Sequence, residues 1–317
     1  MTSSSVPHRG LFRASPWDVV PATLALVQLG LVAAFFVAWP ALSWPSRISL
    51  LLLYAFSVGW NLNSVAHNFI HNPFFRSERL NRLMSLVITL ALITPQTMYR
   101  YVHLKHHAGN ADRPNADGVT IDPLSIYQFG RDGKAEPMLS YVFLQYFRDD
   151  DPFALARKIG VKRPREARQA LFEFWSVILV FGALLAFGIV SERWAFTPLM
   201  VVASYLGQCL SNLNGYYEHL GGNPDKPIAW GVSTYGRIYN WVFLFNGYHA
   251  EHHYRPKVHW TKMTALHRQI AEEQRREGVS VIGWAHFLGF LDPKTHRVPT
   301  ARRRRVVLAG DDPSVAS

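Results

Sequence analysis

The sequence is short of charge and almost without cysteine. Of its 317 residues, 17% are charged and 49% are hydrophobic, which is more apolar than a usual soluble domain. Cys209 is the one cysteine, so an internal disulfide and a cysteine-ligated iron–sulfur or zinc-finger site within one chain are excluded. These shortages indicate a membrane protein, in which any redox chemistry must use ligands other than thiolates.

The sequence also lacks a basic stripe interleaved with aromatic residues. Its formal net charge is +11, but the lysines and arginines are spread over end segments and connections. No nucleic-acid partner is expected from such a distribution. The first apolar run has no small-residue cleavage site, so it is interpreted as a retained anchor rather than a signal peptide.

Four stretches lack charge for long enough to cross a bilayer, which takes about 20 helical residues. They are residues 19–39, 48–66, 174–190 and 195–213, and short connections join them as two hairpins. A fifth apolar run, residues 83–93, has only 11 residues and is predicted to be re-entrant or interfacial. A large soluble helical core is the alternative.

The hairpin connections carry one arginine each, whereas basic residues are abundant in the N-terminal, central and C-terminal segments. The positive-inside rule places those three segments in the cytoplasm. We therefore predict an all-α integral membrane protein with four transmembrane helices as two hairpins, a cytoplasmic helical cap and a re-entrant or interfacial segment. Residues 1–16 form a polar N-terminal segment, 17–292 a single membrane domain, and 293–317 a basic, disordered tail.

Nine of the 14 histidines lie in four short clusters. They are His67 and His71 in HNFIH, His103, His106 and His107 in HLKHH, His219 in NGYYEHLGG, and His249, His252 and His253 in HAEHH. Spacings of three and four residues put side chains on one face of a helix, which is ligand geometry. The remaining histidines are interpreted as ordinary core or surface residues; they are His8, His259, His267, His286 and His296.

A metal site explains these clusters, because uncompensated histidines beside a membrane are costly. Nine imidazoles exceed what one zinc-like ion uses, so two ions are predicted. Imidazole suits iron, copper, nickel and zinc alike, and the ligand type alone does not choose among them. All four clusters fall on the cytoplasmic face only if residues 83–93 do not cross the membrane.

The histidine clusters resemble those of the membrane fatty acid desaturase superfamily of histidine-box enzymes. HNFIH matches its HxxxH box, and HLKHH and HAEHH match its two HxxHH boxes. FNGYHAEHHYRP, residues 245–256, is similar to the third-box region of fatty-acyl and sphingolipid desaturases, and the resemblance spans roughly residues 17–265. The resemblance implies a desaturase-like membrane domain in which all nine histidines hold two non-haem irons that activate dioxygen, with His219 as the extra ligand.

Some features depart from that family. Structurally studied acyl-CoA desaturases carry an asparagine four residues before the extra histidine, where this chain has Gly215; Asn214 is one residue off. NGYYEHLG is instead similar to a segment of membrane alkane hydroxylases. No HPGG haem-binding sequence of a fused cytochrome b5 is present, so a separate electron donor of the ferredoxin, cytochrome b5 or flavoprotein type is implied.

The resemblance implies oxidation of a fatty-acyl chain, with desaturation as the leading hypothesis. Alternatives are an acyl or alkane hydroxylase or ketolase, and a fatty acid decarboxylase that forms terminal alkenes. A zinc-dependent membrane hydrolase or a metal transporter is the alternative from another class.

Candidates for supporting roles surround the clusters. Ligating imidazoles usually donate their other N–H to an acceptor, so the predicted orienting residues are Asn214, Glu218, Glu251 and the acidic residues of NADRPNADG. Two basic residues after the last cluster are predicted to contact either the headgroup of the acyl substrate or the acidic surface of the electron donor; they are Arg255 and Lys257. The residues predicted to line the substrate path are Trp60, Asn63 and Asn68.

Overall fold

The structure is a computed structural model that describes residues 10–109, 113–114, 119–148 and 151–301. Every regular element in these ranges is a helix, as predicted, and extended backbone makes isolated bridges only. The longer helices are α1 Val19–Ala38, α2 Trp44–Asn61, α4 Glu78–Leu92, α5 Gln96–Gly109, α8 Pro164–Val190, α9 Phe196–His219 and α12 Met263–Arg276. The shorter helices are α3 His67–His71, α6 Met138–Leu144, α7 Pro152–Gly160, α10 Arg237–Val242 and α11 His249–Tyr254.

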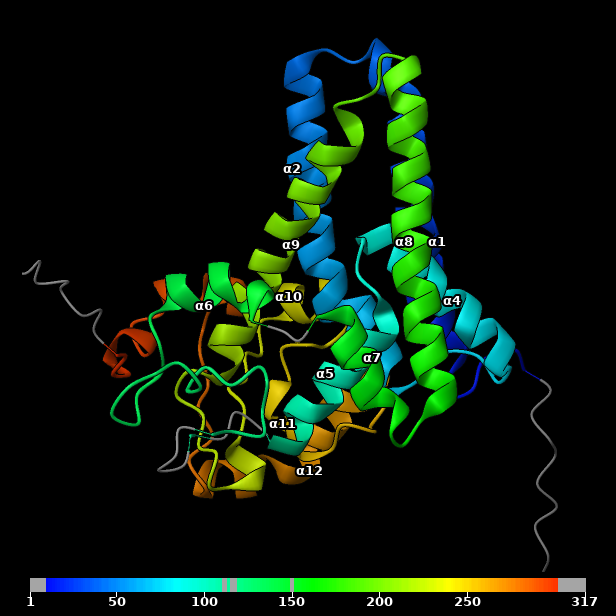
Figure 1. Cartoon of the computed structure of the whole chain (residues 1–317). Coiled ribbons are helices and arrows are strands. Elements are labelled where there is room, and N and C mark those ends of the chain that lie inside the picture. Colours follow the sequence, from blue (N-terminus) through cyan, green and yellow to red (C-terminus); the bar gives the residue numbers. More distant parts are fainter. Residues whose placement is uncertain (1–9, 110–112, 115–118, 149–150, 302–317) are drawn as a thin grey trace, which may run out of the picture.

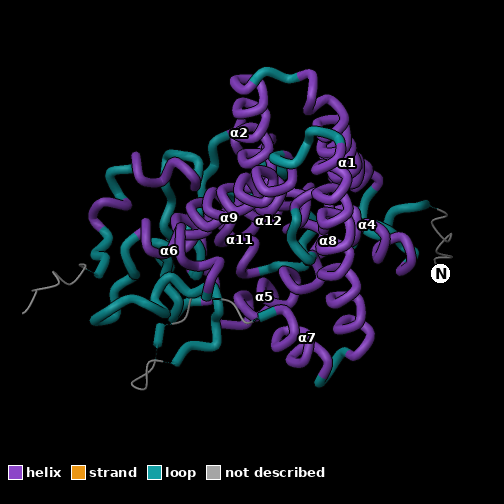
Figure 2. The backbone as a smooth tube through the Cα atoms, turned by 45° about the horizontal axis from the view of Figure 1, so that its top comes forward, coloured by secondary structure: helices purple, strands orange, loops and turns teal. Residues whose placement is uncertain are grey.

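Two helical hairpins, α1 with α2 and α8 with α9, rise from a wider part of the molecule (Figure 1). This wider part, called the base below, contains α4–α7 and α10–α12. Ser43 begins α2, because its hydroxyl accepts a hydrogen bond from the backbone N–H of Ser46 at 3.4 Å. Glu192 follows α8 in the left-handed conformation, with φ 58, which turns the chain towards α9. Figure 2 shows that the loops gather on the α6 side of the base.

Three helical stretches are long and apolar enough to cross a membrane: Pro16–Ala41, Trp44–His71 and Pro164–Val190. They contain three of the four predicted crossings. The fourth, residues 195–213, forms most of α9, which is not among the candidate spans in the described part of the chain. Polar residues such as Gln208 and Asn212 lower the mean hydropathy of α9, so the fourth crossing stays a prediction.

The fifth apolar run lies in α4, which has 15 residues and is also not among the candidate spans of the described chain. Ile93, with φ 56, ends this helix. The hydroxyl of Tyr54 donates to the carbonyl of Ala91 at 3.0 Å and so fastens the end of α4 to α2. That residues 83–93 are re-entrant or interfacial stays a prediction.

Glycines allow α2 and α9 to approach closely. A Cβ added to Gly207 would lie 2.5 Å from the Cβ of Val58, and one added to Gly59 would lie 2.9 Å from the carbonyl oxygen of Gly207. Small residues at a helix crossing let two backbones come together, which favours association within a membrane. This contact fixes the position of α2 relative to α9. The first histidine cluster follows α2 in the chain, and His219 is the last residue of α9.

The start of α1 is fastened to the base by a buried carboxylate. Asp18 Oδ1 accepts hydrogen bonds from His259 Nε2 at 2.8 Å and from Trp260 Nε1 at 3.2 Å. These partners follow the last histidine cluster in the sequence. The contact therefore joins the first predicted crossing to the segment beyond α11.

Part of the predicted tail is described by the structure. In the segment 293–301, the N–H of Ala301 donates to the carbonyl of Ala135 at 2.7 Å, so this stretch folds against the base. The rest of the predicted tail, 302–317, lies outside the described residues, as do residues 1–9 of the predicted N-terminal segment.

Leucine in place of Gly207 is expected to destabilise the protein, since its side chain would overlap α2. Overpacking of such a contact costs about 1–3 kcal/mol. Gly182 of α8 is exposed and has no atom within 4 Å of an added Cβ, so Gly182→Leu is the matched control. Thermal unfolding in detergent measures both, and equal midpoints for the two variants would contradict the close contact of α2 with α9.

Candidate metal centre

The nine clustered histidines lie together in the base as two groups. Within each group, the candidate ligand atoms all lie within 4.8 Å of one another. The five-histidine group consists of His67, His71, His103, His107 and His252. The four-histidine group consists of His106, His219, His249 and His253. The structure thus brings together every residue that the sequence pattern singled out as a metal ligand, and it divides them into two groups that could each hold a metal ion.

Two helices contribute to both groups. On α5, His103 and His107 are one turn apart and belong to the five-histidine group, while His106 belongs to the other. On α11, His252 belongs to the five-histidine group and His249 to the four-histidine group. Adjacent positions on a helix point about 100° apart, so one HxxHH sequence reaches two neighbouring centres. The same pair of helices therefore holds the two groups side by side.

Ring nitrogens in the five-histidine group are crowded. The Nε2 atoms of His71 and His103 are 2.9 Å apart, as are those of His67 and His252. His107 Nε2 lies 3.0 Å from that of His103 and 3.1 Å from that of His252. Nitrogens bound to one ion at about 2.0–2.1 Å are about 3 Å apart, so this spacing fits a metal.

The four-histidine group has a similar arrangement. The Nε2 atoms of His219 and His249 are 3.1 Å apart, and the ring centroid of His106 lies 4.6 Å from that of His219. Both ring nitrogens of His253 are buried without a hydrogen-bond partner in the described part of the chain. Buried polar atoms are normally paired, and a cation would supply the missing partner.

A π-helical turn precedes the first cluster. Residues Leu62–Ala66 form this turn between α2 and α3, a feature that is frequent at functional sites. The amide of Asn63 donates to the carbonyl of Gly59 at 2.8 Å, and the hydroxyl of Ser64 donates to that of Trp60 at 2.6 Å. The extra residue in the turn changes the direction in which α3 presents its histidines.

Asp122 orients His106. His106 Nδ1 is 3.0 Å from both oxygens of this fully buried carboxylate, which requires the proton on Nδ1 and leaves Nε2 with its lone pair. Sequence reasoning pointed instead to NADRPNADG, whose two aspartates, at 112 and 117, lie outside the described residues. An acidic residue within the apolar stretch TIDPL was the available signal for Asp122.

A second buried carboxylate, that of Glu218, is connected to His67 through the side-chain amide of Asn246. Glu218 Oε1 accepts from the side-chain amides of Asn246 at 2.6 Å and Asn214 at 2.7 Å, and His249 Nδ1 lies 3.6 Å away. Asn246 Oδ1 in turn lies 3.0 Å from His67 Nδ1. Asn246, which the sequence pattern did not reveal, thus connects Glu218 to the five-histidine group.

Glu251 lies away from the ring nitrogens. It falls on the opposite face of α11 from the cluster, where it accepts from Ser233 Oγ at 2.8 Å and Tyr235 Oη at 2.9 Å. His267 Nδ1 is 2.6 Å from Glu251 Oε1, the oxygen that also accepts from Tyr235, and this bond raises the pKa of His267. Glu251 therefore fastens α11 to the base and to α12, and Asn214 likewise contacts Glu218 rather than a clustered histidine.

Burial favours the neutral form of five clustered histidines on α5 and α11. Burial lowers the pKa of His103, His107, His249, His252 and His253 well below its ordinary value, and neighbouring imidazoles lower it further. A neutral imidazole has the lone pair that a metal requires.

The other histidines in the described part of the chain stay outside both groups. His286 is buried and donates from Nε2 to the carbonyl of Val232 at 2.9 Å, and burial lowers its pKa to about 3. His259 pairs with Asp18, and His296 contacts the nearby carbonyl of Phe290. His8 lies outside the described residues.

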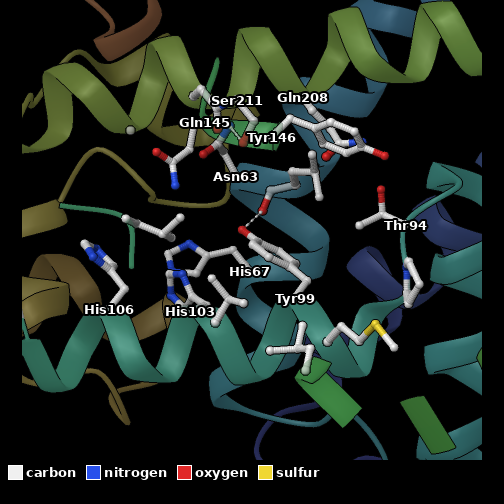
Figure 3. A pocket seen from close by; sticks show the side chains of 18 of the residues that line it. Asn63, His67, Thr94, Tyr99, His103, His106, Gln145, Tyr146, Gln208 and Ser211 are labelled. Atoms are coloured by element: carbon white, nitrogen blue, oxygen red, sulfur yellow. Dashed lines mark hydrogen bonds between the residues drawn. The ribbon is translucent and has the colours of Figure 1, made fainter. Parts of the chain in front are cut away.

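A cavity of about 580 Å³ adjoins both groups. Five clustered histidines line it: His67, His103, His106, His219 and His249. Away from them, its walls include Val177 and Ile178 of α8 and Val201 of α9. Figure 3 shows His67, His103 and His106 towards one end and Thr94 towards the other. The volume is that of a site for a small molecule or part of a lipid chain.

Of the residues predicted to line the substrate path, Asn63 lines this cavity. Trp60 instead donates from Nε1 to the carbonyl of Val242 at 2.9 Å, and Asn68 donates to the carbonyl of Ser64 at 2.9 Å. Arg255 and Lys257 are exposed beyond α11, as a contact surface for a headgroup or donor requires.

Comparisons with known proteins bear on this site. A family model described as fatty acid desaturase matches residues 42–284. The chain is 24% identical over 308 residues to the sphingolipid delta(4)-desaturase DES1-like protein of Arabidopsis thaliana, which covers 96% of this chain and 86% of the relative. It is 25% identical over 301 residues to the temperature-sensitive sn-2 acyl-lipid omega-3 desaturase (ferredoxin), chloroplastic, of the same plant, with coverage of 83% and 66%.

A fatty acid desaturase of Bacillus subtilis (strain 168) is 22% identical over 225 residues, which cover 64% of this chain and 62% of the relative. The stretch matched by the family model is more than half of the chain and contains all nine clustered histidines. This membrane protein therefore belongs to the fatty acid desaturase family and is an oxidoreductase of lipid metabolism.

Proposed function

We propose that the chain holds one iron ion in each histidine group and, with dioxygen, introduces a double bond into the long alkyl chain of a membrane lipid. The observation that carries this proposal is that both groups line one cavity that also reaches α8 and α9. The relatives are named for a sphingolipid and an acyl lipid, and both kinds of lipid contain a long alkyl chain.

The donor set fits the proposed metal. Imidazole suits iron as well as zinc and copper, so the ligands alone do not select the metal. Membership of the desaturase family supports the choice of iron. When bound, the irons would activate dioxygen, the oxidant that removes hydrogen from an unactivated methylene. Desaturation takes two hydrogen atoms from the lipid; these, with two electrons and two protons, reduce dioxygen to two waters.

Residues of the protein orient the histidine rings and surround the alkyl chain. Asp122 fixes the ring of His106, and Asn246 fixes that of His67. Apolar side chains in the cavity wall, such as Val102 and Leu155, exclude water from the alkyl chain. Ile178 and Val201 are each 48% exposed on the outer surface of α8 and α9, so a chain entering there comes from the lipid.

We further propose that the base, both termini and the metal site face the cytoplasm, because basic residues concentrate in the segments outside the hairpin connections. The two electrons come from a separate protein of the ferredoxin, cytochrome b5 or flavoprotein type. Arg255 and Lys257 are exposed beside α11 on the surface where that donor would approach.

Alanine at His106 or at His252 is expected to abolish turnover, because each replacement removes one proposed ligand. His296→Ala is the control, since this exposed residue belongs to neither group. Purified protein is supplied with reductant, oxygen and a panel of lipids, and the products are identified by mass spectrometry. A hydroxylated product or a shortened terminal alkene would show that the reaction is not desaturation.

Metal content tests the two groups separately. The wild-type chain should contain about two irons, one for each group. His71→Ala and His219→Ala change different groups, so each variant should retain about one iron, as measured by mass spectrometry of the metals. Zinc alone, in protein from iron-replete cells, would contradict the proposal.

Asp122→Asn is expected to weaken metal binding in the four-histidine group, because an amide can present its N–H rather than an acceptor to His106. Loss of such an orienting partner typically lowers metal affinity or activity about 10–100-fold. Asp225→Asn, at an exposed aspartate, is the control. Chelator titration measures the affinity; unchanged retention of both irons would argue against an orienting role.

A further inference from the structure

A second pocket, of about 390 Å³, lies between α4 and the first turns of α8. Five residues line this arginine pocket; they are Arg82 of α4 and Arg165, Arg168, Gln169 and Phe172 of α8. None of them lines the cavity beside the histidines. Figures 1 and 2 both show α4 beside the base end of α8. Three cationic side chains from two helices far apart in the sequence thus share one pocket.

No carboxylate balances these arginines. All three are exposed, and their guanidinium groups make no ion pair or hydrogen bond with the described residues. The acids nearest in the sequence are engaged elsewhere, since Glu78 pairs with Arg13 and Glu166 pairs with Arg100 at 3.0 Å. Glu173 is fully buried and accepts hydrogen bonds from α4 and α5. The like charges around the pocket therefore repel one another, and an anion between them would relieve that repulsion.

The arginine pocket lies where both helices change from charged to apolar. After Arg82, α4 has no charged residue up to its end at Leu92, and after Arg168 the one charged residue of α8 is the buried Glu173. The stretch that forms α8 is also a candidate membrane span. Such a change marks the level of the lipid headgroups, where a membrane carries its phosphates.

An apolar stripe continues from the pocket along α8. Phe172, Trp175 and Leu179 follow Arg168 at spacings of three and four residues, so all four side chains lie on one face of the helix. The three apolar side chains are 55%, 47% and 68% exposed. Positive-inside bias accounts for arginines at the end of a membrane helix, but it does not gather them around a pocket that leads onto an apolar face.

We propose that the arginine pocket binds the headgroup of an anionic phospholipid, with its phosphate between the guanidinium groups and an acyl chain along the stripe. Arginine suits this task, because its planar fork of N–H groups matches phosphate oxygens. This lipid is separate from the lipid that is oxidised, since the pocket and the metal cavity have no lining residue in common. It joins α4 to α8, the helix that also walls the metal cavity.

Binding to purified full-length protein in a neutral detergent tests the inference without turnover, so the identity of the reaction does not affect the result. Three probes separate charge from chain. Dioleoylphosphatidylglycerol has a net negative charge, dioleoylphosphatidylcholine has the same chains and phosphate but a choline that neutralises the charge, and inorganic phosphate has no chain. Native mass spectrometry counts the bound lipids during each titration and gives the dissociation constants.

The wild-type protein is expected to bind one phosphatidylglycerol about tenfold more tightly than phosphatidylcholine. Each basic residue at a membrane surface contributes about fivefold to the affinity for anionic lipid. Arg165→Gln combined with Arg168→Gln should therefore weaken binding of phosphatidylglycerol about 25-fold. Arg268→Gln combined with Arg275→Gln removes the same charge from exposed positions of α12 and should bind as the wild type does.

Equal binding of the two lipids by the wild type would overturn the inference. An equal loss in both double variants would also overturn it, because net charge rather than the pocket would then set the affinity. Displacement of phosphatidylglycerol by an equimolar amount of inorganic phosphate would show that the site takes free phosphate and not a lipid. Should the pocket variant fail to fold, the comparison of probes on the wild type decides alone.

Discussion

The structure depends on one constraint, which is that buried imidazole nitrogens cannot be crowded together unless something attracts their lone pairs. Neighbouring Nε2 atoms in the five-histidine group lie about 3 Å apart, and His253 has no partner for either ring nitrogen in the described chain. A cation in each group would remove this conflict, because each ring nitrogen would donate its lone pair to the metal. The hairpins, α5 and α11 then serve to hold the rings in place.

The carboxylates near the groups have different tasks. Asp122 contacts a ring directly, while Glu218 reaches His67 only through Asn246. Both are buried, and burial of a charge is tolerated only with hydrogen bonds, which the Leu124 N–H and the asparagine amides provide. Because Glu218 also lies near His249, a change at this residue would be felt in both groups.

The sequence was sufficient for features that are local. Three of the four histidine clusters are helix-spaced motifs, and the long apolar runs predict helices, so eight of the nine residues and most of the helical architecture followed from spacing and composition. His219 stands alone in its segment, and the resemblance to the desaturase family indicated its role. The π-helical turn before His67 was not predictable, because one extra residue in a turn leaves no mark in composition. Glu251 looked suitable because it lies inside HAEHH, but helix geometry turns it to the opposite face.

Features that depend on distant segments were missed. Asp122 lies 16 positions after His106 in the sequence, so helix spacing does not relate the two residues. Asn246 resembles any other asparagine until Glu218 and His67 are beside it. On α9, Gln208 and Asn212 reduce the apolar character by which a crossing is recognised. The structure shows that these residues line a cavity, so the weaker hydrophobic signal reflects a polar wall.

The division of α11 between the two groups has a consequence for biosynthesis. Both sets of rings include members from this helix, so neither is complete until the ribosome has passed residue 253. The hairpin helices α1, α2, α8 and α9 precede it in the chain and are available for insertion earlier. Each complete set of ring nitrogens can therefore form only after all four hairpin helices have been synthesised.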